Sequence, residues 1–250
     1  SLSGKSSAGN FILGQNVFDT SRRTAQSEAR QKDVFSRRVT VVDTPGWWWI
    51  WPKEETPKLD QIEIQNSVHL CPPGPHVFLL VIPVDLYLPQ WVKASLKQHL
   101  KLFNVDVFCH TIMLITAVAP CSDEEVESRI NTKGKELQEL LEKCGNRYHV
   151  INPNQYGDAV QVKELFQKII NMVKQNKGCF TAESKQNTFL SFLWPPKQPT
   201  LTEKEWSRRE QELVERMMKA LAKEPEEPTE PHFTVFVTCF SLITFQCLFQ

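Results

Sequence analysis

The chain has 250 residues, of which 41% are hydrophobic and 23% charged, and its 29 basic and 29 acidic residues give a formal net charge of zero. This length and composition allow one substantial hydrophobic core with additional segments. The balanced charge argues against a broad nucleic-acid-binding surface, so we expect no nucleic acid among the partners. The seven cysteines are scattered and form no C-x-x-C pair, which argues against a zinc or dithiol site and indicates reduced cytosolic thiols.

Short apolar segments alternate with longer helical patterns along the first 180 residues. Nearly charge-free segments rich in β-branched residues predict strands at 39–42, 77–82, 111–115 and 148–151. Helical patterns lie at 7–14, 59–70, 89–103, 123–144 and 158–176. Asp123 suits the N-cap of the fourth of these helices, and Gly145 suits its C-cap. Strands and helices alternating in this way predict an α/β protein with a doubly wound, mostly parallel sheet.

The motif Gly4-Lys5-Ser6-Ser7 stands directly before the first predicted helix. It matches the end of a phosphate-binding loop, G-x-x-x-x-G-K-[ST], in which helix N–H groups and a lysine hold phosphates and a hydroxyl binds Mg²⁺. Only three residues precede Gly4, so we expect the first strand and the first half of the loop to be absent from this sequence. Because that strand would lie in the middle of the sheet, we expect its neighbours to have unpaired backbone groups, and nucleotide binding to be weak.

A second motif, Asp43-Thr44-Pro45-Gly46, follows the apolar strand VTVV. A carboxylate at the end of such a strand can hold Mg²⁺ through water, and the N–H group of Gly46 can approach a γ-phosphate. The alternative is an ordinary Pro-Gly turn, which would be preferred for this motif on its own. The two motifs together favour a nucleotide site.

The stretches "GKSSAGNFILG", "VTVVDTPGWWW" and "EKCGNRYHVINPN" resemble the immunity-associated (IMAP) GTPase family of septin-like G proteins. The resemblance covers about residues 1–180 and implies a P-loop G domain, here lacking its first strand, that binds GTP or GDP with Mg²⁺. It implies nucleotide-binding roles for Gly4, Lys5, Ser6, Ser7, Asp43, Gly46 and Asn152. It also implies that Ser6, Thr24 and Asp43 contact the metal, although an exposed loop threonine is the alternative for Thr24.

The base-recognition motif departs from the family pattern. Relatives tend to have an aspartate after the fourth strand, where this chain has Ala119, and we interpret Asp123 as a helix cap rather than a displaced guanine ligand. Two functions follow. One is a GTP-dependent assembly switch that forms homo- or hetero-oligomers with related G domains, with at most weak GTPase activity and no assignable catalytic residue. The other is a pseudo-GTPase interaction module that no longer binds nucleotide.

Four segments follow the G domain. We expect a linker at 181–199, an amphipathic helix at 200–223, an acidic proline-rich linker at 224–231 and an apolar tail at 232–250. Thr202 and Glu205 predict a capping box at the start of the helix.

The apolar tail has two interpretations. Residues 233–250 carry no charge, and their length is at the lower edge of the roughly 17–25 residues that span a bilayer. With the family resemblance, this predicts a cytoplasmic protein whose tail is a candidate anchor in an intracellular membrane. Polar residues within the tail and its acidic flank argue against an anchor, and the alternative is a buried strand.

Overall fold

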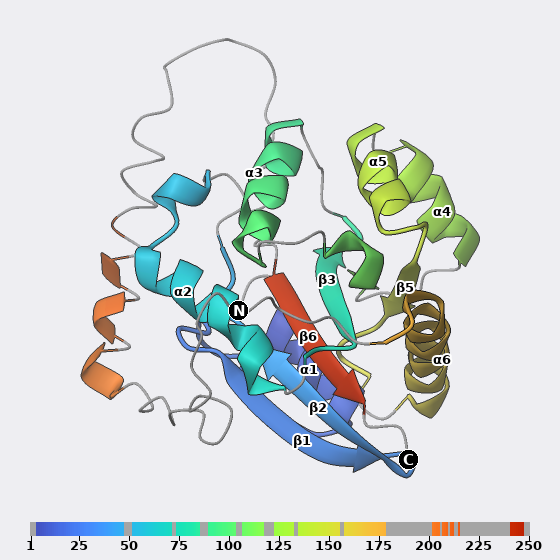
Figure 1. The fold of residues 1–250 in the computed structure, drawn as a ribbon, viewed down its shortest axis with the longest axis horizontal. Coiled ribbons are helices and arrows are strands. Elements are labelled where there is room, and N and C mark those ends of the chain that lie inside the picture. The colour runs from blue at the N-terminus through green and yellow to red at the C-terminus, as the bar shows by residue number, and fades with distance from the viewer. Residues whose placement is uncertain are drawn as a thin grey trace.

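The structure, a computed structural model, describes residues 4–47, 52–71, 74–85, 90–103, 107–117, 123–132, 135–155, 158–178 and 241–247, and parts of 202–215. Its centre is a six-stranded sheet with the order β1-β2-β6-β3-β4-β5 (Figure 1). The strands are β1 (Glu28–Val34), β2 (Arg37–Asp43), β3 (Val77–Pro83), β4 (Thr111–Thr116), β5 (Tyr148–Ile151) and β6 (Ser241–Cys247).

Four of the strands run in one direction. β3, β4 and β5 pair in parallel, and β6 is antiparallel to both of its neighbours, β2 and β3, so β2 runs parallel to β3. β1 forms an antiparallel hairpin with β2 at one edge of the sheet. The predicted α/β class with a mostly parallel sheet is therefore confirmed.

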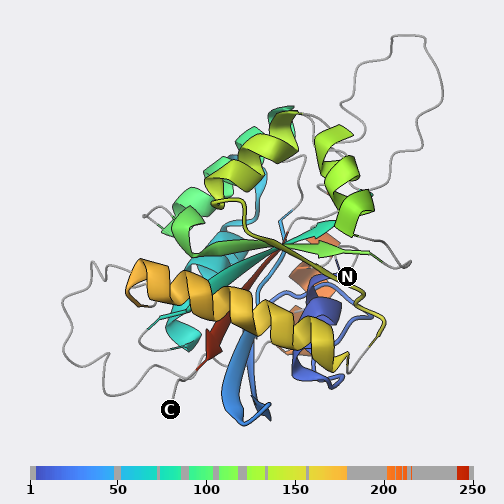
Figure 2. The same cartoon turned by 90° about the vertical axis from the view of Figure 1, so that its right-hand side faces the viewer.

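Helices cover both faces of the sheet (Figure 2). One face carries α1 (Lys5–Leu13) and α6 (Ala159–Asn176), and the other carries α2 (Lys58–Asn66), α3 (Gln90–Leu100), α4 (Asp123–Thr132) and α5 (Lys135–Lys143). Four 3-10 turns complete the described elements: η1 (Lys53–Glu55), η2 (Ser67–Leu70), η3 (Lys101–Phe103) and η4 (Phe108–His110). None of the helices in the described parts of the chain has the length and hydropathy to cross a membrane.

The helix boundaries differ most from the sequence prediction at 123–144, whereas the helices expected at 59–70 and 89–103 each end in a 3-10 turn. Two helices, α4 and α5, take the place of the one expected over 123–144. Asp123 is the first residue of α4, whereas an N-cap would precede the first helical residue. Gly145 has a positive φ of 63° immediately after the last turn of α5, as a glycine C-cap requires.

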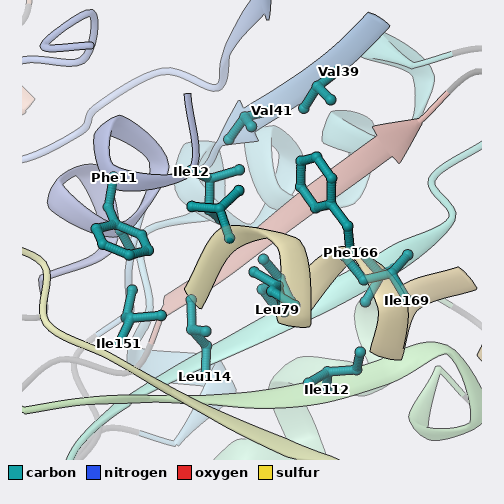
Figure 3. Close-up of a cluster of buried hydrophobic side chains, with 14 of the residues drawn as sticks. Phe11, Ile12, Val39, Val41, Leu79, Ile112, Leu114, Ile151, Phe166 and Ile169 are labelled. Atoms are coloured by element: carbon teal, nitrogen blue, oxygen red, sulfur yellow. The ribbon is translucent and has the colours of Figure 1, made fainter. Parts of the chain in front are cut away.

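Alternate residues of the central strands enter two separate cores. In β3, Phe78 and Leu80 face α2 to α5, whereas Leu79 and Val81 face α1 and α6. Figure 3 shows the second core, in which Phe11 and Ile12 of α1 and Phe166 of α6 lie among side chains of β2, β3, β4 and β5. Both faces of these strands are buried, which explains why their sequences read as continuous apolar runs.

Two strands were not predicted as part of the sheet. β1 has the sequence EARQKDV, and its largely polar, exposed residues carry no apolar signal because it is an edge strand held by its hairpin. β6 belongs to the tail that the sequence analysis separates from the G domain. The expectation that β2 and β3 have unpaired backbone groups between them is wrong, because β6 pairs with both strands.

A polar group is buried in the core below α3. His99 is fully buried, its Nδ1 lies 2.8 Å from the carbonyl oxygen of Ser95, and its Nε2 lies 2.6 Å from the hydroxyl oxygen of Thr56. Its ring stacks on Trp47 with centroids 4.7 Å apart. Trp47 therefore packs within the domain. The neighbouring tryptophans at 48, 49 and 51 lie outside the described residues.

This histidine is expected to make folding pH-dependent. Burial lowers the pKa of His99 from 6.5 to about 4, so the unfolded chain takes up the proton first and stability falls as the pH drops from 6.5 towards 4. By linkage, the loss at pH 5 is about 2 kcal/mol. Urea denaturation at pH 7 and pH 5 measures it, and His99→Gln, which can still hydrogen-bond to Ser95 and Thr56, should lose correspondingly less. Equal pH dependence in the two proteins would contradict this assignment.

Candidate functional site

Four of the predicted site residues meet at the carboxyl end of β2. Asp43 accepts hydrogen bonds from Ser6 Oγ at 2.7 Å and Thr24 Oγ1 at 2.9 Å on Oδ2, and it pairs with the Lys5 ammonium through Oδ1. Lys5 also donates to Thr24 Oγ1 at 3.0 Å. We call these four residues the Asp43 cluster. Lys5 and Ser6 are almost completely buried, with 1% and 0% of their surface exposed.

Local sequence explains how the cluster forms. Gly4 precedes α1 with a φ of 70°, a conformation that favours glycine, and its carbonyl oxygen accepts the first helical hydrogen bond from Ala8. Gly9 lets α1 approach its neighbours, because a Cβ there would lie 2.9 Å from the ring of Phe18. The buried strand β2 then brings Asp43 to the edge of the sheet where α1 begins.

The cluster has the chemistry of a phosphate and hard-cation site. The first N–H groups of α1 have no partner within the helix, and together with the Lys5 ammonium they favour an anion. The oxygens of Ser6, Thr24 and Asp43 are hard ligands of the kind Mg²⁺ takes alongside phosphate oxygens, so the residues present fit this metal. Within the part of the chain that the structure describes, there is no group of three His, Cys, Asp or Glu residues that would favour another metal.

The loop that carries Thr24 is tethered on two sides. Arg23 pairs with Asp60 of α2, whose side chain is only 3% exposed. On the other side, Arg209 Nη1 donates to the carbonyl oxygen of Ala25 at 3.0 Å, and Arg22 pairs with Glu203 at 2.9 Å.

The second tether belongs to the helix expected at 200–223. Its described residues between 203 and 215 are helical, and the N–H of Glu205 donates to Thr202 Oγ1 at 3.3 Å, which is one half of the predicted capping box. The loop preceding β1 is thus held to two helices that lie far apart in sequence.

The other predicted residues are further from the Asp43 cluster or less defined. Ser7 and Gly46 are half-buried, next to Ser6 in α1 and three residues after Asp43. Asn152 follows β5, and its Oδ1 accepts from the N–H of Asn154 at 3.1 Å. Ala119 lies outside the described residues, and so does the side chain of Asp123.

Sequence analysis missed two features of the site. Thr116, the last residue of β4, lies close to Gly4, since a Cβ on Gly4 would be 3.8 Å from its hydroxyl oxygen. The signal was available, because sites in parallel sheets form at the carboxyl ends of strands. The pairing of Arg23 with Asp60 had no sequence signal, because the two residues are brought together only by the packing of α2.

Comparison with known proteins gives a consistent result. The AIG1 family matches residues 1–191 of the chain. GTPase IMAP family member 8 of Homo sapiens is 31% identical over 190 residues, which is 73% of this chain and 27% of that protein. The chain therefore spans about a quarter of the length of this curated relative.

Solved structures share the fold. Toc33 from Arabidopsis thaliana, in complex with GDP and Mg²⁺, matches with a TM-score of 0.55 and 14% identity, over 72% of this chain and 84% of Toc33. A dimerization-deficient mutant of Toc33 matches with a TM-score of 0.53 and 14% identity, over 70% of this chain and 81% of the mutant.

Removing the carboxylate of the cluster should destabilise the protein even without a ligand. Asp43→Asn leaves the buried Lys5 ammonium without its counter-charge, and we expect the free energy of unfolding to fall by about 3–5 kcal/mol. The double variant Lys5→Met/Asp43→Asn, which removes both charges, should recover part of the loss. Urea denaturation of the three proteins checks this, and a single variant as stable as the unmodified chain would show that the pair is not a buried ion pair in solution.

Proposed function

Because the chain belongs to the AIG1 family, we propose that it binds a guanine nucleotide, GTP or GDP, together with Mg²⁺ at the start of α1. The observation that carries this proposal is the convergence of Lys5, Ser6 and Thr24 on Asp43 at the N-terminus of a helix. Phosphate is the ligand that such a lysine and helix terminus favour. The fold it shares with Toc33, whose structure contains GDP and Mg²⁺, supports the same assignment.

Each residue has a defined part in this proposal. The backbone N–H groups of Gly4, Lys5, Ser6 and Ser7 surround the phosphates, and the Lys5 ammonium exchanges Asp43 for a phosphate oxygen. Ser6, Thr24 and Asp43 hold Mg²⁺, which neutralises phosphate charge when bound. The N–H group of Gly46 would approach the γ-phosphate, and Asn152 would contact the base.

The output of the site is an assembly switch. The loop of Thr24 is tied to α2 and to the helix at 203–215, so a change at Thr24 on nucleotide binding would alter both contacts. We infer that the nucleotide state controls association with a second copy or a related G domain, with slow or no hydrolysis. The existence of a dimerization-deficient Toc33 mutant, which implies that Toc33 dimerizes, supports this role. We propose a cytoplasmic location, and membrane anchoring through the tail stays a prediction.

One observation favours the alternative of a pseudo-GTPase module. Lys5 already has a buried carboxylate partner, and all four side chains of the Asp43 cluster satisfy one another. A bound nucleotide must replace these interactions with others that are at least as favourable in free energy. If it cannot, the chain would keep its fold and lose nucleotide binding.

Calorimetry with Mg²⁺-GTP distinguishes the two functions. We expect weak but measurable binding that Lys5→Ala abolishes, because the ammonium is the charged group closest to the phosphates. Lys58→Ala, at an exposed position on α2, is the matched control and should bind as the unmodified chain does. A folded chain that binds neither GTP nor GDP would support the pseudo-GTPase module.

The base preference gives a second test. Since Ala119 offers no carboxylate to guanine, GTP and ATP should compete almost equally for the site. Ala119→Asp should raise the preference for GTP by about tenfold or more, because it supplies the acceptor for the guanine N–H groups. Competition binding measures this ratio. A strong preference for GTP in the unmodified chain would instead point to Asp123 or Asn152 as the guanine ligand.

A further inference from the structure

The centre of the sheet is filled by a strand from the far end of the chain. β6 pairs with β2 from Val39 to Asp43 and with β3 from Val77 to Val81, in each case antiparallel (Figure 1). The two registers overlap, so Thr244 is opposite Val42 on one side and Phe78 on the other. Its sequence, SLITFQC, has no charge and is rich in β-branched and aromatic residues, as a central strand requires.

The position of this strand is defined by the candidate site. The start of α1 lies between the carboxyl ends of β2 and β4, because Lys5 pairs with Asp43 and Gly4 lies close to Thr116. α1 itself packs against β2 and β6. The strand before a phosphate-binding loop runs parallel to its neighbours and leads directly into the loop. A strand leading into Gly4 would therefore lie between β2 and β3.

We propose that residues 241–247 act as a substitute central strand. They complete the sheet in the slot between β2 and β3, where the strand that leads into a phosphate-binding loop belongs. The slot has room for one strand. Occupation by 241–247 and occupation by a parallel strand that leads into Gly4 are therefore mutually exclusive. The strand assignment stands independently, whereas its influence on a nucleotide rests on the proposed function.

The substitute strand connects the two parts of the site. Within the described residues, the β1-β2 hairpin is hydrogen-bonded to β3, β4 and β5 only through β6. Asp43 ends β2 and is opposite Ile243, while Ser241 is opposite Val81, so β6 begins at the edge of the sheet that carries the site. Release of β6 would detach the strand of Asp43 from the rest of the sheet. The tail thereby controls whether the Asp43 cluster stays beside Thr116 at the end of β4.

Disulfide trapping tests the register in the full chain. Val39 is opposite the native Cys247, and directly opposed residues of an antiparallel pair have Cβ atoms roughly 4.5–5.5 Å apart. Val39→Cys should therefore form a disulfide with Cys247 on mild oxidation, detectable by peptide mass spectrometry. Thr40→Cys is the matched control, because its side chain lies on the opposite face of β2, and it should not cross-link to Cys247. Absence of the Val39→Cys link, or a link formed only between two copies, would overturn the proposal.

A proline substitution tests the consequence for the site. Thr244→Pro removes an N–H group from the middle of β6, and we expect amide exchange to increase at least tenfold in both β2 and β3. Thr234→Pro, in the same tail but before residues 241–247, is the control and should leave both strands protected. Unchanged protection in Thr244→Pro would overturn the proposal.

Nucleotide binding by the same variants separates this proposal from the proposed function. If the unmodified chain binds Mg²⁺-GTP, Thr244→Pro should weaken binding at least tenfold while Thr234→Pro does not. Equal affinity in the two variants would overturn the control of the site by the tail. If no variant binds nucleotide but Thr244→Pro still loses protection in β2 and β3, the strand assignment is supported and the proposed function fails.

Discussion

The structure depends on the interaction of one carboxylate with three donors. Asp43 accepts hydrogen bonds from Lys5, Ser6 and Thr24, and so joins the start of α1, the loop before β1 and the end of β2. A buried ammonium and a buried carboxylate are tolerated only when each has a partner and the remaining lone pairs are hydrogen-bonded. This requirement fixes where α1 sits on the sheet, and it places hydroxyl, carboxylate and ammonium groups at the N-terminus of a helix. The same constraint that stabilises the fold therefore assembles the elements of a phosphate site.

The Asp43 cluster is only as rigid as the position of β2. Two apolar cores hold the sheet against its helices, and alternate residues of β3 and β4 contribute to each. β2, however, reaches the other parallel strands through β6, a segment that comes from the end of the chain. Residues close to both ends of the sequence, in α1 and in β6, therefore contact the same strand, β2. β6 can connect β2 with β3 although it runs antiparallel to both, because strands can hydrogen-bond through their backbones in either direction.

The loop of Thr24 connects the site with the surface. Its neighbours Arg23 and Ala25 contact α2 and the helix at 203–215, so one short loop is shared by the Asp43 cluster and by two helices. The Asp43 cluster is therefore joined through this loop to parts of the chain that lie far apart in sequence. On the opposite face of the sheet, the ring of His99 stacks on Trp47, which follows β2 in the chain. The same histidine is hydrogen-bonded to Thr56.

Sequence by itself determined the local parts of this protein. The sequence predicted the apolar strands β3, β4 and β5 and the helices between them, because burial restricts which residues can occupy those positions. It also predicted that Lys5, Ser6 and Asp43 lie at the ends of elements, because phosphate chemistry restricts those positions too. The polar edge strand β1 could not be predicted from the sequence, since it is stabilised by pairing with β2 and carries no apolar pattern. Only the tertiary structure decided that Arg23 meets Asp60 and that 241–247 enters the centre of the sheet. An uncharged β-rich segment fits a bilayer or a sheet equally well by composition, and the choice depends on the edges of β2 and β3, which are in place only once the rest of the chain has folded.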